Sequence, residues 1–154
     1  MSTFIGDFVS KIDTKGRVVL PSVFKKAMVA LNVERFVVRK DLFEPCLVLM
    51  PYSEWELEME DIRSRINLYN RTENKFYRQY FRGAAEINLD ANGRMLIPKR
   101  LLEKIECPKE LVMVGVDMKI ELWSKETYEK DEMSEEDLAK MAETILGSKS
   151  NFEG

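Results

Sequence analysis

The alternation of apolar and polar residues predicts a strand–turn–strand unit near the start of the chain. Residues 8–12 alternate in part, and residues 17–20 are rich in the branched side chains that favour strands. Between them, residues 13–16 include an aspartate, which can bond a backbone N–H two residues on, and a glycine, which accepts a positive φ. We therefore expect a tight hairpin whose second strand ends at Pro21.

A short helix and two further strands are expected to complete this first unit. Apolar residues recur at helical spacing along residues 23–31, and Ser22 precedes them as the expected N-cap. Buried strands are expected at residues 36–39 and 46–50.

Two helices are predicted next. Ser53 and Glu56 match the capping-box pattern of a helix start. The apolar side of this helix is expected to hold Trp55, Met59, Ile62, Ile66 and Tyr69. Residues 70–72 interrupt the pattern, and a second helix over residues 73–82 should end at Gly83. We interpret its aromatic stripe as core or subunit contact rather than as a cofactor site.

The strand–turn–strand pattern returns in the second half of the chain. Residues 12–21 and 89–98 share the order apolar, Asp, two variable residues, Gly, Arg, three apolar residues and Pro, 77 positions apart. The elements expected to follow the first unit's order are strands 86–89, 94–97, 111–114 and 119–123 and helix 99–105. Such a repeat indicates one unit used twice. Each unit is too small to bury a core alone, so we expect a single shared core.

The C-terminal segment is expected to be helical and acidic. Ser124 should cap a short helix, a further helix is expected over residues 134–146, and residues 148–154 are expected to be a loose end. The formal net charge of the 154-residue chain is −3, but the charge is unevenly spread. Residues 1–43 carry eight basic and four acidic side chains, whereas from residue 129 onward eight are acidic and three basic. The chain is therefore electrically polarised from end to end.

The sequence lacks the residue types on which several classes of catalytic and metal-binding site depend. The chain has no histidine, which excludes Ser-His-Asp triads and His-ligated zinc. Cys46 and Cys107 follow no metal spacing and are expected to be unpaired thiols in a reducing cytosol. No apolar run approaches the roughly 20 residues of a membrane helix, and a secretory signal is not expected. Without a nucleophile beside a base or a Gly-rich phosphate loop, we predict no enzyme activity, no cofactor and no metal site.

The repeated motif has a structural interpretation. Asp13, Gly16, Asp90, Gly93 and Arg94 would shape the two turns, each aspartate bonding its own turn and the arginine four residues on. Such a surface Asp–Arg pair contributes at most about 1 kcal/mol, and the pattern by itself indicates no ligand.

The residues around the first turn support a functional interpretation as well. Lys11 and Lys15 flank this turn beside Arg17, whereas the corresponding positions of the second turn are Asn88 and Asn92. This difference is expected if both turns are structural and the first also binds an anion. A hairpin can enter the DNA major groove, where arginine reads guanine and lysine meets phosphate.

The duplicated motif resembles that of the MraZ family of bacterial transcriptional regulators. The likeness rests on the two Asp-x-x-x-Arg motifs, each followed by three apolar residues and proline, and on residues 81–85 at the end of the two-helix insert. It covers roughly residues 3–130. The resemblance implies an α+β fold: a duplicated AbrB-like swapped-hairpin β-barrel, pseudo-dimeric, with peripheral helices.

The resemblance also implies a domain order. SpoVT-AbrB-like units are expected at residues 7–54 and 83–126, with a helical insert at 55–82 and an acidic helical extension at 127–154. A cytoplasmic, nucleoid-associated and ring-shaped homo-oligomer is implied, with no membrane partner.

The implied function is repression by binding double-stranded DNA at tandem short repeats in the promoter of the division and cell-wall gene cluster. The family's DNA-contacting arginine corresponds to Arg17, with Lys15 as the basic residue beside it. Lys11, which is also absent from the second copy, is the third expected contact. The alternative is an antitoxin-like protein-interaction module that docks through the acidic C-terminal helix.

Overall fold

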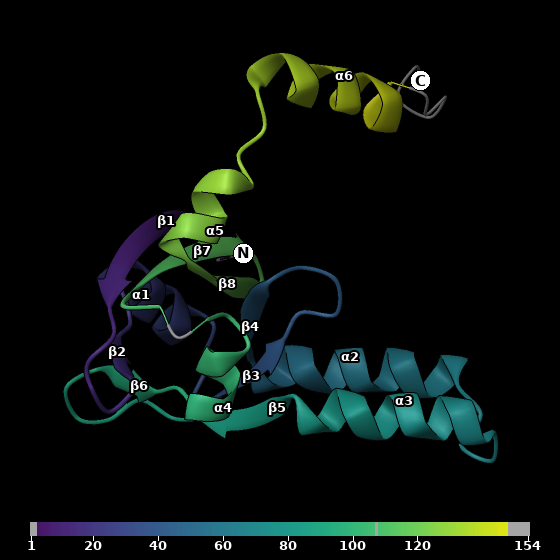
Figure 1. Cartoon of the computed structure of the whole chain (residues 1–154). Coiled ribbons are helices and arrows are strands. Elements are labelled where there is room, and N and C mark those ends of the chain that lie inside the picture. The colour runs from purple at the N-terminus through teal and green to yellow at the C-terminus, as the bar shows by residue number, and fades with distance from the viewer. Residues whose placement is uncertain (1–2, 107, 148–154) are drawn as a thin grey trace.

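Residues 3–106 and 108–147, the part described by this computed structural model, form a six-stranded antiparallel sheet, a two-stranded ribbon and surrounding helices (Figure 1). The strands are β1 Phe4–Lys11, β2 Arg17–Val19, β3 Phe36–Lys40, β4 Cys46–Pro51, β5 Ala84–Ile87, β6 Arg94–Leu96, β7 Glu110–Asp117 and β8 Lys119–Ser124. The sheet order is β1-β7-β8-β4-β3-β5, and β2 pairs with β6. The expected α+β character is confirmed.

Strands from the two halves of the chain pair with each other. The pairs β1–β7, β4–β8, β3–β5 and β2–β6 each join a strand of the first half to one of the second. In the repeat, β5 is the counterpart of β1 and β7 that of β3, so the sheet has the same order of counterparts from either edge. Closure into a swapped-hairpin barrel and the unit boundaries given above stay predictions.

The main hydrophobic core is drawn from both halves of the chain. Phe4, Phe24 and Phe36 of the first half and Met95 and Leu111 of the second are fully buried in one cluster. The Phe4 and Phe24 rings meet edge to face, 5.8 Å apart between centroids. Because each half supplies only part of this cluster, its burial requires both.

A second, smaller cluster lies beneath a helical hairpin. Helices α2 (Tyr52–Arg65) and α3 (Arg71–Arg82) run side by side away from the sheet (Figure 1). Trp55 stacks on Tyr80 at 5.4 Å, and an ion pair of 2.6 Å joins the buried Arg39 of β3 to Glu58 of α2. The cluster comprises Val37, Val48, Met50, Trp55, Met59 and Tyr80. The expectation of one core therefore misses the separate packing of this insert.

Two expected helix caps are wrong. Helix α1 (Ser22–Ala30) has Pro21 as its N-cap, and α2 has Pro51. Ser22 and Ser53 lie within the first turns, and neither helix has a side-chain cap bond. Proline favours an extended backbone and has no N–H to satisfy, so each helix begins directly after it. Helix α4 (Lys99–Glu103) likewise follows Pro98.

Helix α2 is also shorter than its apolar pattern suggests. It ends at Arg65, Ile66 is extended with φ −116° and ψ 153°, and Tyr69 is fully exposed. The side chain of Asn70 accepts a hydrogen bond from the N–H of Glu73 (3.0 Å) and thereby caps α3. This local cap decides where the chain reverses.

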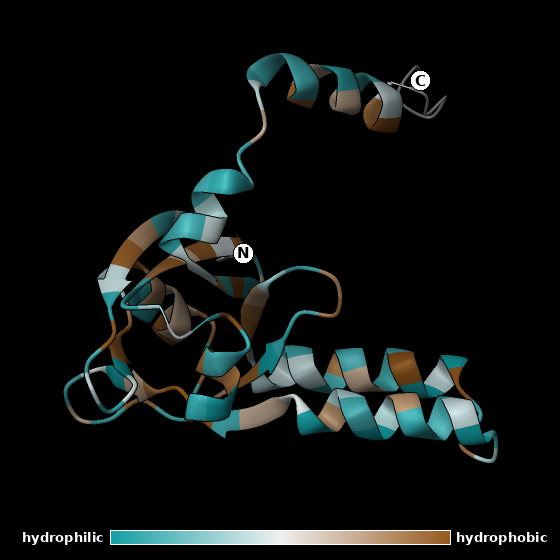
Figure 2. Cartoon of the chain, in the orientation of Figure 1, coloured by the Kyte–Doolittle hydropathy of each residue, from teal (hydrophilic) through white to brown (hydrophobic). Residues whose placement is uncertain are grey.

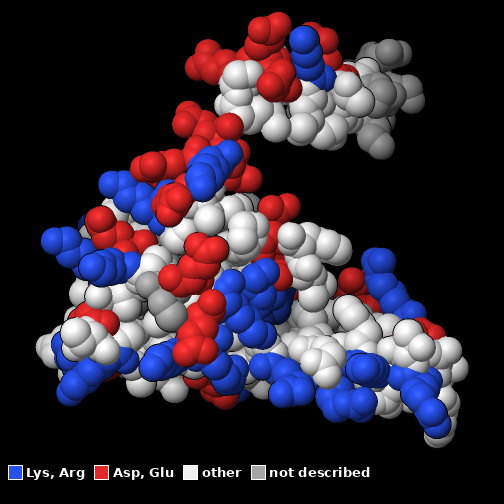
Figure 3. Space-filling view, viewed as in Figure 1, with Lys and Arg blue, Asp and Glu red and all other residues white. Residues whose placement is uncertain are grey.

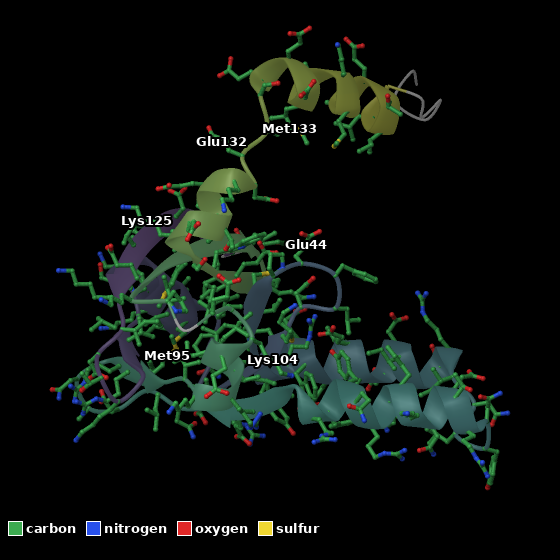
Figure 4. The ribbon with its side chains drawn as sticks, in the orientation of Figure 1. Glu44, Met95, Lys104, Lys125, Glu132 and Met133 are labelled. Atoms are coloured by element: carbon green, nitrogen blue, oxygen red, sulfur yellow. The ribbon has the colours of Figure 1, made fainter. Side chains whose placement is uncertain are left out.

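Serine caps begin both C-terminal helices, and the first of these caps, Ser124, is as expected. Ser124 accepts a hydrogen bond from the N–H of Thr127 (3.2 Å) at the start of α5 (Lys125–Lys130), and Ser134 caps α6 (Glu135–Leu146). Helix α6 stands clear of the sheet (Figure 1), and Glu132 and Met133 lie in the link that carries it (Figure 4).

The structure tests the prediction of an unpaired thiol at only one of the two cysteines. Cys46 is a buried free thiol, and burial raises its pKa to about 12. The predictions for Cys107 and for residues 148–154 lie outside the described residues. Among the helices of the described part, none has the length and apolarity needed to cross a membrane.

Candidate nucleic-acid interface

The first turn is held by one aspartate. Asp13 Oδ1 accepts hydrogen bonds from the backbone N–H groups of Lys15 (2.9 Å) and Arg17 (2.8 Å), and Oδ2 accepts one from Arg17 Nε (2.7 Å). Gly16 has φ +86°, and its N–H donates to the carbonyl of Asp13. The carboxylate therefore fixes the backbone and aims the arginine at the same time.

The second turn has the same geometry. Asp90 accepts from the N–H groups of Asn92 (2.8 Å) and Arg94 (2.9 Å) and from Arg94 Nε (3.0 Å). Gly93 has φ +73°. The two turns thus differ in side chains rather than in backbone, since Asn92 occupies the position of Lys15.

The two turns are joined into one surface by the β2–β6 ribbon. Beside the ribbon, the N–H of Ile97 donates to the carbonyl of Gly16 (2.9 Å), and the N–H of Leu20 donates to that of Gly93 (3.1 Å). Each turn is therefore clamped by the strand end that follows the other turn. Residues 73 and 81 positions apart thereby become direct neighbours.

One face of the ribbon is exposed and carries both arginines. Arg17 lies opposite Leu96 and Arg94 opposite Val19, and directly opposed residues of an antiparallel pair share a face. The Arg17 and Arg94 side chains are 33% and 30% exposed. The intervening pair of Val18 and Met95 faces the core and is buried.

This shared face is the feature that reasoning along the chain misses. The motif assigns Arg94 only to its own turn, whereas the ribbon places it on the same face as Arg17. Lys25 of α1 follows the first turn in sequence, but its Nζ lies directly over Gly93 of the second turn. No local sequence pattern indicates either neighbour, since both depend on pairing between distant segments.

A cleft opens beside the first turn. Its volume is about 700 Å³, and it lies between residues 11–16, residues 97–102 and the start of β7. We call it the hairpin cleft. Lys11 and Lys15 border it, so two of the three expected DNA contacts line this hollow. Within residues 3–106 and 108–147, no group of three or more acidic or cysteine side chains is arranged to hold a metal ion.

Asp13 and Asp90 are expected to titrate below the ordinary aspartate pKa of 3.8. The N–H groups of Arg17 and Arg94 are the main cause of the lowered pKa, because they bond the charged carboxylate. Since the folded pKa is depressed, this contribution to hairpin stability is present above pH 3.8 and is lost as the pH falls through the folded value. Carboxyl carbon chemical shifts followed by NMR provide the measurement. Midpoints at or above 3.8 would contradict the geometry.

Comparisons with known proteins agree along almost the entire chain. A family model described as "MraZ protein, putative antitoxin-like" matches residues 80–149. The chain is 39% identical to the transcriptional regulator MraZ of Phocaeicola vulgatus over 150 residues, 97% of each chain. It is 37% identical to that of Bacteroides thetaiotaomicron over 154 residues, 100% of this chain and 99% of the relative. For the relative from Clostridium acetobutylicum the identity is 35% over 142 residues, 92% of this chain and 96% of the relative.

Proposed function

This chain belongs to the MraZ family of transcriptional regulators, and we propose that it binds double-stranded DNA through the exposed face of the β2–β6 ribbon. In the finer proposal it represses the division and cell-wall gene cluster from tandem short repeats in the promoter. The observation that carries the proposal is the pair of arginines, Arg17 and Arg94, held on one exposed face by their own carboxylates. A two-stranded ribbon has the width that a DNA major groove admits.

Arg17 is the residue to which we assign base reading. Its Nε is engaged by Asp13, and we assign the two Nη groups of the guanidinium to the DNA. Two donors on one planar edge match the O6 and N7 acceptors of guanine. The aspartate limits the side chain's rotation before DNA arrives, which lowers the entropy lost on binding.

Lys11 and Lys15 are assigned to the phosphates. Both are exposed beside the first turn, and a lysine is a mobile point charge suited to phosphate oxygens. They are absent from the second copy, so we expect the first turn to lie deeper against the DNA. Asp13, Gly16, Asp90 and Gly93 hold the turns.

A homo-oligomer, in the finer proposal a ring, would compensate for the weak DNA binding of a single acidic subunit. With a net charge of −3, one subunit is weakly repelled by DNA as a whole. Several hairpins on tandem repeats add their contacts within one assembly, and this avidity exceeds the affinity of each hairpin.

Selection from random double-stranded DNA with the full chain tests the function. We expect enrichment of one short repeated element, with binding that weakens by orders of magnitude between about 50 mM and about 200 mM salt, because released counterions make phosphate contacts salt-dependent. A shuffled sequence of equal length is the control. Failure to enrich any element at the lower salt concentration would contradict the proposal.

The antitoxin-like alternative has its own observation. The exposed acidic helix α6 is a separate surface that the ribbon does not use. On this view a different protein co-purifies with the full chain and is lost when residues 131–154 are removed, while DNA binding is unchanged.

A further inference from the structure

Helix α6 has an apolar stripe that no other residue of the described part of the chain covers. Leu138, Met141 and Ile145 follow at helical spacing and are 58%, 45% and 55% exposed. Apolar and polar positions alternate around the helix (Figure 2). A 12-residue helix is marginal in water by itself, so an exposed amphipathic helix of this length gains most of its stability by packing.

The same helix is strongly acidic. Between residues 131 and 146, six carboxylates stand against one lysine, Lys140. Figure 3 shows acidic side chains gathered along α6 and basic ones prominent at the lower part of the body. A surface that binds α6 must therefore have apolar side chains at its centre and basic side chains around them.

The hairpin cleft has both properties. Its apolar lining is Ile12, Ile97, Leu102 and Pro108. Its basic lining is Lys11, Lys15, Lys99 and Lys109. Among the described residues, none of these four lysines has a carboxylate within ion-pair distance. Of the two acids that line the cleft, Asp13 is already bound by Arg17, which leaves Glu110.

We propose that α6 of a second copy of this chain docks in the hairpin cleft. Three apolar side chains enter the cleft, and the flanking carboxylates meet the lysine rim. Twelve residues make a helix of about 18 Å, enough to lie across the cleft and cover Lys11 and Lys15.

The position of α6 favours a second copy over its own chain. The link at residues 131–134 spans at most about 14 Å. Helix α6 lies at the top of the view, beyond α5, whereas the two turns lie at the lower left (Figure 1). The helix thus extends away from the cleft of its own chain.

Docking would oppose DNA binding, a consequence that rests on the proposed function. The docked helix occupies the lysines assigned to phosphate and places carboxylates beside them. If the helix fills the cleft about four-fifths of the time, the apparent Kd for DNA rises about five-fold, because affinity falls with the binding-competent fraction.

Zero-length carbodiimide cross-linking, without DNA, tests the docking itself. In the wild-type chain we expect α6 carboxylates joined to Lys99 or Lys109, identified by mass spectrometry of peptides. The reagent joins only groups at ion-pair distance. Absence of these links, or α6 linked instead to Lys119 or Lys125 near the β1 edge, would overturn the proposal.

Two full-length variants expressed together show whether α6 docks in the cleft of a second chain or in that of its own chain. One carries Lys99→Glu and Lys109→Glu, and the other Leu138→Glu and Ile145→Glu. Both pairs lie at the surface of helices or loops, so the fold is retained. A link between Lys99 and an α6 peptide with Leu138 can then form only between chains. Links in the wild type that disappear from this mixture would show docking within one chain and overturn the proposal.

DNA binding provides the second readout. The Leu138→Glu, Ile145→Glu variant should bind the selected repeats about five-fold more tightly than wild type, despite its added negative charge. Weaker or unchanged binding by this variant would refute the competition, whereas the cross-links report the docking alone. Loss of DNA binding by every form would count against the proposed function and not against the docking.

Discussion

Replacing Arg17 by alanine is expected to weaken binding to the selected DNA repeats by about 10- to 100-fold for each contacting hairpin. A bidentate arginine–guanine contact contributes about 1–3 kcal/mol, and alanine removes both donors. Because several hairpins of one assembly bind together, the losses multiply in the measured affinity. Fluorescence anisotropy with labelled repeat DNA measures the change.

The fold of the Arg17→Ala variant is expected to persist. Asp13 keeps its bonds to the N–H groups at residues 15 and 17, which the substitution leaves in place. The lost Asp–Arg pair is exposed and contributes little to stability. An unchanged thermal transition and an unchanged oligomer mass would assign the lost affinity to the contact. Wild-type affinity in this variant would disprove the assignment.

Arg94→Ala is the matched control, since Arg94 has the same carboxylate, backbone geometry and ribbon face. We expect a smaller loss, because the second turn lacks the two flanking lysines. Equal losses would mean that both turns contact DNA equally. Lys15→Ala should weaken binding to all sequences alike and reduce the salt slope by about 0.9 per phosphate contact.

Replacing Gly115 by alanine is expected to destabilise the fold by about 4 kcal/mol. Gly115 of β7 pairs with Gly6 of β1, and a Cβ there would lie 2.6 Å from both the Ile5 nitrogen and the Phe4 carbonyl oxygen. These are backbone atoms, so no side-chain rotation relieves the clash. Strand β1 must move away and withdraw the fully buried Phe4 ring, and loss of a buried phenylalanine costs about 3–5 kcal/mol.

Gly83→Ala is the control for this prediction. A Cβ at Gly83 meets nothing closer than 3.7 Å, and its φ of −89° suits alanine. We expect a change in stability within about 0.5 kcal/mol. Urea denaturation of the two variants and the wild type gives the free energies of unfolding. Equal stability of the Gly115→Ala variant and the wild type would contradict the close approach of β1 and β7.

Local structure follows the sequence closely where the determining interactions are local. The two Asp–Gly–Arg turns, the serine caps of α5 and α6, and the approximate positions of the strands all depend on residues within a few positions of each other. The errors arise where two local signals compete. The N-cap of α1 and of α2 is the proline that precedes the expected Ser22 and Ser53. Helix α2 ends before Ile66, although the apolar spacing continues, and Asn70 caps the next helix.

In the candidate site, too, some features depend on residues near each other in sequence and others on the pairing of distant strands. The motif residues and the lysine asymmetry are visible in the sequence, whereas the common face of Arg17 and Arg94 depends on β2–β6 pairing. The hairpin cleft likewise joins residues 11–16 with residues 97–102 and 108–110.

The sequence by itself determined that this protein is one unit used twice, with two aspartate-held turns and a basic first turn. Turn chemistry and side-chain period act over a few residues, so they can be recognised along the chain. Only the tertiary structure decided that the two turns form one surface, that Gly115 must be a glycine, and that α6 has an exposed apolar stripe. Those features depend on which distant strands pair, and that choice is made by burying a core to which both halves contribute.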